Sequence, residues 1–122
     1  MAARPVLLEF LHHTLLPDYM EDLELDVAGG TLAIPLTHPI VNKTTGGAEA
    51  LTLADGEPGQ MLVMFLGTDG GDGTLTPATS TNFATIVFAD AGDMAVLFYV
   101  NDTIGWIILA LHGTAGPPAF TV

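Results

Sequence analysis

The sequence predicts a mainly β protein, a small antiparallel sandwich or barrel preceded by an N-terminal arm. Short apolar runs rich in β-branched and aromatic residues recur through residues 44–122, and turn-forming residues separate them at regular intervals. Helical spacing is confined to the first sixteen residues. We expect an arm over residues 1–21, a β domain over 22–113 and a C-terminal tail over 114–122.

The N-terminal arm carries an apolar stripe. Leu7, Leu8, Leu11 and Leu15 recur near helical spacing, and Pro17 ends the pattern. A short amphipathic helix and an extended arm both fit these residues. Neither can bury its apolar side alone, so the arm is expected to dock on its own domain or on a neighbouring subunit.

A change to period two begins after the arm. Acidic and apolar residues alternate over 22–27, two glycines follow at 29 and 30, and a second β-prone run covers 31–34. Glycine pairs allow the positive φ angles of tight hairpin turns. These residues therefore predict a β-hairpin.

The next segment is marked by two prolines, Pro35 and Pro39. Proline cannot donate a hydrogen bond to a strand ladder, which predicts a sheet edge or a connection here. A break is expected over Lys43–Gly47, because threonines and glycines follow the lysine. Further strands are predicted at Ala48–Leu53, Gln60–Leu66, Gly73–Pro77, Ala84–Phe88, Asp93–Val100 and Gly105–Leu111.

Two of the predicted strands are apolar on both faces. The runs Met94–Val100 and Trp106–Leu111 lack the alternation expected of a half-exposed antiparallel strand. They are either central in the sheet or covered by another subunit. The residues predicted to pack in the core or in an oligomer interface are Phe98, Tyr99, Trp106 and Ile108.

Composition excludes several classes of function. The chain of 122 residues has a formal charge of -12, and its only basic residues are Arg4 and Lys43. Nucleic-acid surfaces are rich in lysine and arginine, so no nucleic-acid partner is expected. No apolar run is long enough for a membrane helix. Apolar residues make up 49 % of the chain, which favours a subunit interface.

Catalytic and metal-binding motifs are not found. His12, His13, His38 and His112 do not have the spacing of a zinc site, and no cysteine is present. The acidic glycine-rich run at 69–73 lacks the repeated ligands of a calcium loop and predicts a tight polar turn. The only serine is in no nucleophile motif. We therefore expect no catalytic residues, no metal and no cofactor.

An ordered set of strand and turn motifs carries a family resemblance over Thr45–Gly113. The segment resembles a β-rich module of tailed-phage structural proteins, especially capsid decoration or cement proteins and fibre-like proteins of cyanophages and marine phages. The run Met61–Leu66 departs from this module, whose strand is more polar, and favours burial between subunits. The matching pieces are Ala50–Gly56, Pro58–Gln60, Gly73–Pro77, Ala84–Phe88, Gly92-Asp93 and Gly105–Ile108.

The resemblance implies a virion structural protein without enzymatic activity. It would be made in the bacterial host cytoplasm, form a homotrimer and bind the outer surface of the major capsid protein lattice, where it stabilises the phage head. A head- or tail-fibre module that binds host glycans is the first alternative, and a small carbohydrate-active enzyme or calcium-binding module is the second. The arm residues expected at the capsid are Val6, Leu7, Leu8, Phe10 and Leu11.

Overall fold

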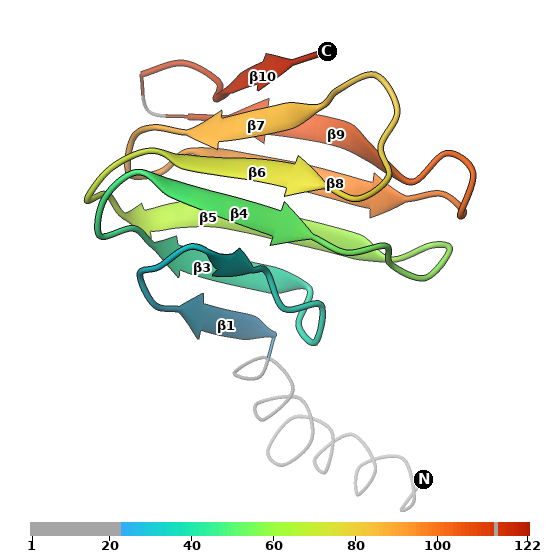
Figure 1. The fold of residues 1–122 in the computed structure, drawn as a ribbon, viewed down its shortest axis with the longest axis horizontal. Helices are drawn as coiled ribbons and strands as arrows, with labels where there is room; N and C mark the ends of the chain where they lie inside the picture. Colours follow the sequence, from blue (N-terminus) through green and yellow to red (C-terminus); the bar gives the residue numbers. More distant parts are fainter. Residues whose placement is uncertain (1–22, 114) are drawn as a thin grey trace, which may run out of the picture.

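A computed structural model describes residues 23–113 and 115–122 (Figure 1). This part of the chain contains ten strands and no helix. In chain order they are β1 (Glu24–Val27), β2 (Leu32–Ala33), β3 (Ile40–Thr44), β4 (Glu49–Leu53), β5 (Met61–Thr68), β6 (Gly73–Pro77), β7 (Thr85–Phe88), β8 (Met94–Tyr99), β9 (Trp106–His112) and β10 (Ala119–Thr121).

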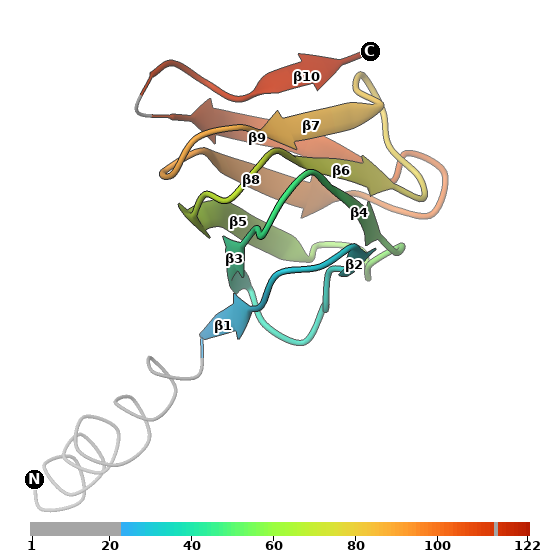
Figure 2. The same cartoon turned by 60° about the vertical axis from the view of Figure 1, so that its left-hand side comes forward.

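The strands form two five-stranded sheets that pack face to face. The first sheet has the order β1-β3-β5-β8-β9, and the second has the order β10-β7-β6-β4-β2. The sheets are not joined into a closed barrel, so the predicted β-sandwich is confirmed. Both views show β9 and β10 at one side of the sandwich and β1 at the other (Figures 1 and 2).

Both sheets are mixed, not purely antiparallel as predicted. From β1 to β6 the chain crosses to the opposite sheet after every strand, so neighbours in each sheet run parallel. Two parallel strands must be joined by a crossover connection, because a hairpin joins only antiparallel strands. The later strands are antiparallel, with β8 between β5 and β9, and β7 between β6 and β10.

The hairpin predicted over 22–34 is therefore wrong. β1 pairs with β3 in the first sheet, while β2 pairs with β4 in the second. The connecting turn is held by the Lys43 ammonium, whose Nζ donates to the Ala28 carbonyl at 2.8 Å, and by Glu49, whose Oε2 accepts from the Gly30 N–H at 2.8 Å. These contacts fix the turn where the chain passes between the sheets.

The break predicted over Lys43–Gly47 begins two residues too early, since only residues 45–47 of it lie in the connection between β3 and β4. Lys43 and Thr44 end strand β3, which lies between β1 and β5. The two prolines, Pro35 and Pro39, lie in the connection from β2 to β3, as predicted. Six strands predicted between residues 48 and 111 occur within two residues of the expected bounds.

The core lies between the sheets and includes a ring pair from neighbouring strands. Tyr99 and Trp106 are fully buried, with ring centroids 5.2 Å apart in an edge-to-face arrangement. The indole Nε1 of Trp106 donates to the Ala54 carbonyl at 2.9 Å. Gly105 precedes this ring at φ +71°, and a Cβ there would collide with the Thr79 backbone. The close approach therefore requires glycine.

The C-terminal residues add a strand to the second sheet. β10 pairs antiparallel with β7, so this part of the predicted tail is an edge strand. Its register places Phe120 opposite Ile86. Phe120 itself is half exposed.

Candidate interaction surfaces

The outward side of the first sheet is apolar. We define the outer apolar face as the apolar side chains on the outward side of β3, β5, β8 and β9, a side that also carries Asn42 and Thr44 at the β3 end. Strand β8 shows the alternation clearly, since its inward residues Ala95, Leu97 and Tyr99 are fully buried while the residues between them are partly exposed. The face comprises Ile40, Met61, Val63, Phe65, Met94, Val96, Phe98 and Ile107.

The residues of this face are cross-strand neighbours. Met61 lies opposite Phe98, which lies opposite Ile107 on the next strand. A second row runs from Val63 to Val96. Because adjacent strands are about 4.8 Å apart, these rows form one continuous surface across the sheet. Met61 is 44 % exposed.

The outward side of the second sheet is different. Its strands β4 and β6 present Thr52, Thr74 and Thr76 between buried residues. Threonine is a usual residue of a solvated strand face. The sandwich therefore has one polar face and one apolar face, and the apolar one is the stronger candidate for contact with a partner.

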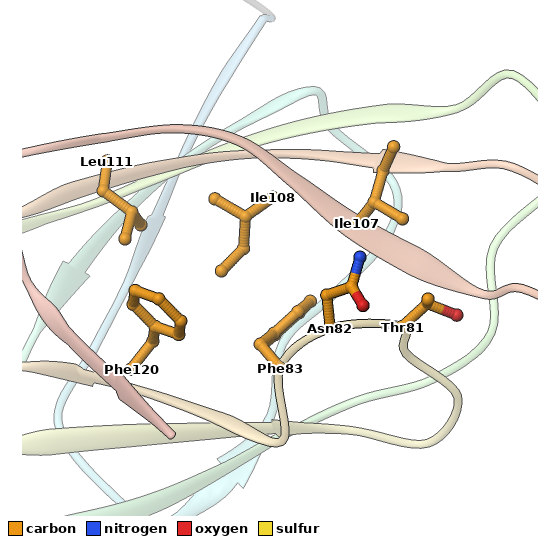
Figure 3. Close-up of a pocket in the computed structure, with 7 residues that line it drawn as sticks. All are labelled: Thr81, Asn82, Phe83, Ile107, Ile108, Leu111 and Phe120. Carbon is orange, nitrogen blue, oxygen red and sulfur yellow. The ribbon is translucent and has the colours of Figure 1, made fainter. Parts of the chain in front are cut away.

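A second apolar feature lies between the two sheets at the β9–β10 side (Figure 3). We call this open groove, of about 360 Å³, the edge groove. In Figure 3 the side chains of Ile108 and Leu111 on β9 point towards Phe83 and Phe120. The residues that line it are Thr81, Asn82, Phe83, Ile107, Ile108, Leu111 and Phe120.

Exposed apolar residues gather around the edge groove. Leu109 on β9 is 52 % exposed, and Phe120 on β10 is 50 % exposed. Val122, the last residue, is 94 % exposed. Three of the four large apolar side chains that are largely exposed in the described residues therefore lie on these edge strands or directly after them.

Charge is absent from both apolar surfaces. Strands β5, β7, β8, β9 and β10 contain no acidic or basic residue apart from His112. Within the described residues, the acidic side chains are in β1, at Glu49 in β4, and in connecting loops. Lys43, the one lysine of the described residues, is fully buried, and these residues include no arginine. The described surface is thus acidic around two uncharged patches.

A buried ion pair links the sheets beside the β1–β2 turn. Lys43 Nζ donates to Glu49 Oε1 at 2.8 Å, to the Ala28 carbonyl at 2.8 Å and to the Thr44 carbonyl at 2.7 Å. The other Glu49 oxygen accepts from the Gly30 and Gly46 N–H groups. The hydrogen bond from Lys43, helped by the bond from Gly46, lowers the pKa of Glu49 to about 2.

The sequence did not predict this ion pair, because the threonines and glycines after Lys43 favoured a break at that residue. The one available signal is the alternation of Val41 and Lys43 on the same side of a short strand. With its ammonium donating to a carboxylate and two close carbonyls, the pair is fully engaged in the fold.

The four predicted packing residues separate in the structure. Tyr99 and Trp106 belong to the core. Phe98 lies on the outer apolar face, and Ile108 lines the edge groove. The predicted capsid-contact residues Val6, Leu7, Leu8, Phe10 and Leu11 lie outside the described residues.

The acidic loop at 69–73 is a tight polar turn, as predicted. The Asp69 carboxylate accepts from the Gly71 N–H at 3.0 Å. Within residues 23–113 and 115–122, no group of three or more histidine, aspartate or glutamate side chains has the arrangement of a metal site. In the same ranges, no helix is long and apolar enough to span a bilayer.

No protein-family model matches the chain, and comparison with curated proteins finds no significant relative. The candidate surfaces therefore depend on the geometry described above.

Proposed function

We propose that the protein is a virion structural protein, a capsid cement or decoration protein that binds the outer surface of the major capsid lattice and stabilises a phage head. The observation that carries this proposal is the outer apolar face, which is uncharged and spans several strands. The sequence resemblance supplies the class of partner. No reaction is involved.

The shape of the outer apolar face suits a broad protein surface. It is formed by four neighbouring strands of one sheet, so its side chains project from a rigid hydrogen-bonded scaffold. Large exposed apolar patches are uncommon on monomers and are typical of protein interaction sites. A flat capsid surface would bury Met61, Phe98 and their neighbours without demanding a cleft.

The acidic surround supports the same proposal. Carboxylates at Glu24 and Asp26 lie on β1, at the edge of the first sheet. A high net negative charge keeps the free protein soluble before it binds the capsid. An apolar contact surface with an acidic border therefore favours binding to a chosen partner over general aggregation.

The glycan-binding alternative receives less support from the described residues. It needs aromatic side chains exposed at a loop end. Tyr99 and Trp106 are buried, and Phe83 is 4 % exposed. Phe120, the aromatic residue that is largely exposed, lies on an edge strand beside the edge groove.

Co-sedimentation tests the proposal. The full chain is mixed with undecorated shells assembled from the major capsid protein of the same phage, and the Val96→Asp variant is compared with Thr52→Asp. Val96 lies within the outer apolar face, whereas Thr52 lies on the polar face of the other sheet. A carboxylate buried in an apolar contact is costly, so Val96→Asp is expected to bind at least about tenfold more weakly.

Thr52→Asp adds the same charge and is expected to bind as the unchanged chain does. Circular dichroism of both variants checks that the sheets are retained. A chain that does not pellet with shells would refute the capsid proposal. Equal binding by the two variants would show that the outer apolar face is not the contact surface.

A further inference from the structure

We propose that the edge groove and the open edge of β9 bind the N-terminal segment of a second copy of this chain. The segment, residues 6–11, would add a strand to the first sheet of its neighbour. The inference rests on the proposed function only for the number of copies, since a repeated head-to-tail contact would build the expected homotrimer.

The four edge strands of the two sheets differ in length and charge. β1 carries Glu24 and Asp26, β2 has two residues and β10 has three. Charged or very short edge strands are the usual protection against unwanted pairing. β9 has seven residues, with no charge other than His112 and no proline. It is the one edge in the described residues that is both long and free of Asp, Glu, Lys and Arg, and its one irregularity is a bulge at Leu109 in the pairing with β8.

The backbone of β9 is open along most of its length. β8 pairs with one side of it. On the other side, Trp106 donates to the Thr79 carbonyl and accepts from the Thr81 N–H. This bridge covers the first residue of β9, and no strand of the described residues pairs with the outer side beyond it. An added strand would satisfy those backbone groups.

The edge groove provides space beside the open edge of β9. The edge groove is apolar where Ile108 and Leu111 from β9 lie opposite Phe120, and Thr81 and Asn82 line its other end (Figure 3). A cavity of about 150 Å³ holds one benzene-sized group, so a groove of this size has room for roughly two. An extended segment with large apolar side chains on one side matches both the groove and the free edge.

The sequence of residues 6–11 matches the groove and the edge of β9. Alternate residues of a strand point to opposite faces. In an extended arrangement Val6, Leu8 and Phe10 share one side and would enter the edge groove. Leu7, Glu9 and Leu11 share the other side, where the two leucines would extend the outer apolar face beyond β9. The side with Val6, Leu8 and Phe10 is therefore the wholly apolar one and matches the edge groove, while Glu9 on the other side would face solvent.

A second copy is the better donor than the same copy. The described chain begins beside β1, which lies at the far edge of the first sheet from β9 (Figure 2). Four strand spacings separate these edges, roughly 19 Å. To reach its own β9, the linker over 12–22 would cross the outer apolar face and set Asp18, Glu21 and Asp22 against it. Such burial of unpaired carboxylates is unfavourable.

A donor edge and an acceptor edge on opposite sides of the molecule make a heterologous contact. Contacts of this kind close into a ring when the rotation between copies allows it. Three copies, each giving its segment to the next, would produce the homotrimer. This assignment places Val6, Leu8 and Phe10 in contact with a neighbouring copy of the chain. The family resemblance instead implies that these residues contact the capsid.

Light scattering of the full chain without capsids is the first test. The unchanged chain is expected to be a trimer, and the double variant Leu8→Asp with Phe10→Asp is expected to be a monomer. The matched control, His12→Asp with Thr14→Asp, adds two carboxylates outside the segment and should remain a trimer. A monomeric unchanged chain would overturn the proposal, as would a double variant that stays trimeric.

Cross-linking identifies the acceptor. The chain has no cysteine, so Leu8→Cys with Leu109→Cys introduces one reactive pair for a short bismaleimide. Covalent dimers and trimers on a denaturing gel are expected. The control, Leu8→Cys with Glu24→Cys on β1, should give none. A link confined to single chains, or no link, would overturn the proposal whatever the outcome of capsid binding.

Discussion

At the scale of single residues, the main finding is how the fold uses its one described lysine. Lys43 and Glu49 come from different sheets and close the sandwich beside the turn that follows β1. Their bonds to the Ala28 and Gly30 backbone determine where the chain changes sheet. A buried charge is tolerated when a counter-charge and further hydrogen bonds satisfy it, as they do here.

The ion pair predicts a loss of stability in acid. The pKa of Glu49 is lowered from 4.5 to about 2. The folded protein therefore favours the charged carboxylate, and this contribution is complete above about pH 4.5 and is lost as the pH falls towards 2. Denaturant unfolding of Glu49→Gln is expected to show lower stability near neutral pH and a smaller loss between pH 5 and about 2.

Asp55→Asn is the matched control for this experiment, because Asp55 lies in an exposed stretch after β4. It should keep the pH dependence of the unchanged chain. If Glu49→Gln loses stability in acid as steeply as the unchanged chain does, the ion pair does not have the stabilising role described above.

Tyr99 predicts a loss of stability in alkali. Burial and the hydrogen bond to Asp102 raise the pKa of its hydroxyl from 10.0 to about 12. The folded protein thus favours the neutral phenol, and stability is expected to fall as the pH rises from about 10 to 12. In Tyr99→Phe that fall should shrink, as measured by denaturant unfolding, with Tyr19→Phe as the control. An unchanged alkaline slope would contradict the assignment.

At the scale of strands and turns, the sequence predicted the existence of most elements but not their partners. Glycine and aspartate turns correctly separated the six strands from β4 to β9, because turn residues and apolar alternation are local signals. The pairing of β1 with β3 is not local, since it depends on a turn held by Lys43 and Glu49 from later strands. A glycine pair between two β-prone runs predicts a hairpin unless such distant contacts are known.

The candidate surfaces were predictable to the same degree. The two-sided apolar runs at Met94–Val100 and Trp106–Leu111 correctly marked the strands that carry them. Which side of each strand faces the core depends on the register of the sheet. The sequence alone therefore does not show that Tyr99 faces the core and Phe98 faces outward. The edge groove needs β9 and β10 to lie on the same side of the sandwich, which is a property of the whole topology.

The turn between β8 and β9 gives a prediction at this scale. Gly105 has φ +71°, and a side chain there would meet the Thr79 backbone. Gly105→Ala is expected to lower the free energy of unfolding by about 1–3 kcal/mol through backbone strain and displacement of Trp106. Gly47→Ala, where a Cβ meets nothing within 4 Å, should be close to neutral. Equal stability of the two variants would disprove the role of this turn.

At the scale of the whole molecule, the distribution of charge separates two modes of binding. The formal charge is -12, and the acidic residues of the described part lie off the outer apolar face and off β9 and β10. An acidic protein can bind a partner through its charges or through the surfaces that its charges avoid. The arrangement here favours the second mode, because the uncharged surfaces are also the exposed apolar ones.

Salt dependence of capsid binding distinguishes the two modes. Salt screens exposed charges, with a Debye length that falls from about 10 Å at 0.1 M to about 3 Å at 1 M. If the outer apolar face makes the contact, co-sedimentation with undecorated shells is expected to stay constant or to strengthen over this range, because repulsion between acidic copies on the shell weakens. Sulfate, which strengthens apolar burial, should increase binding further. Binding that weakens progressively with salt would instead assign the contact to the carboxylates of β1 and the loops. The acidic border would then be the surface that recognises the shell.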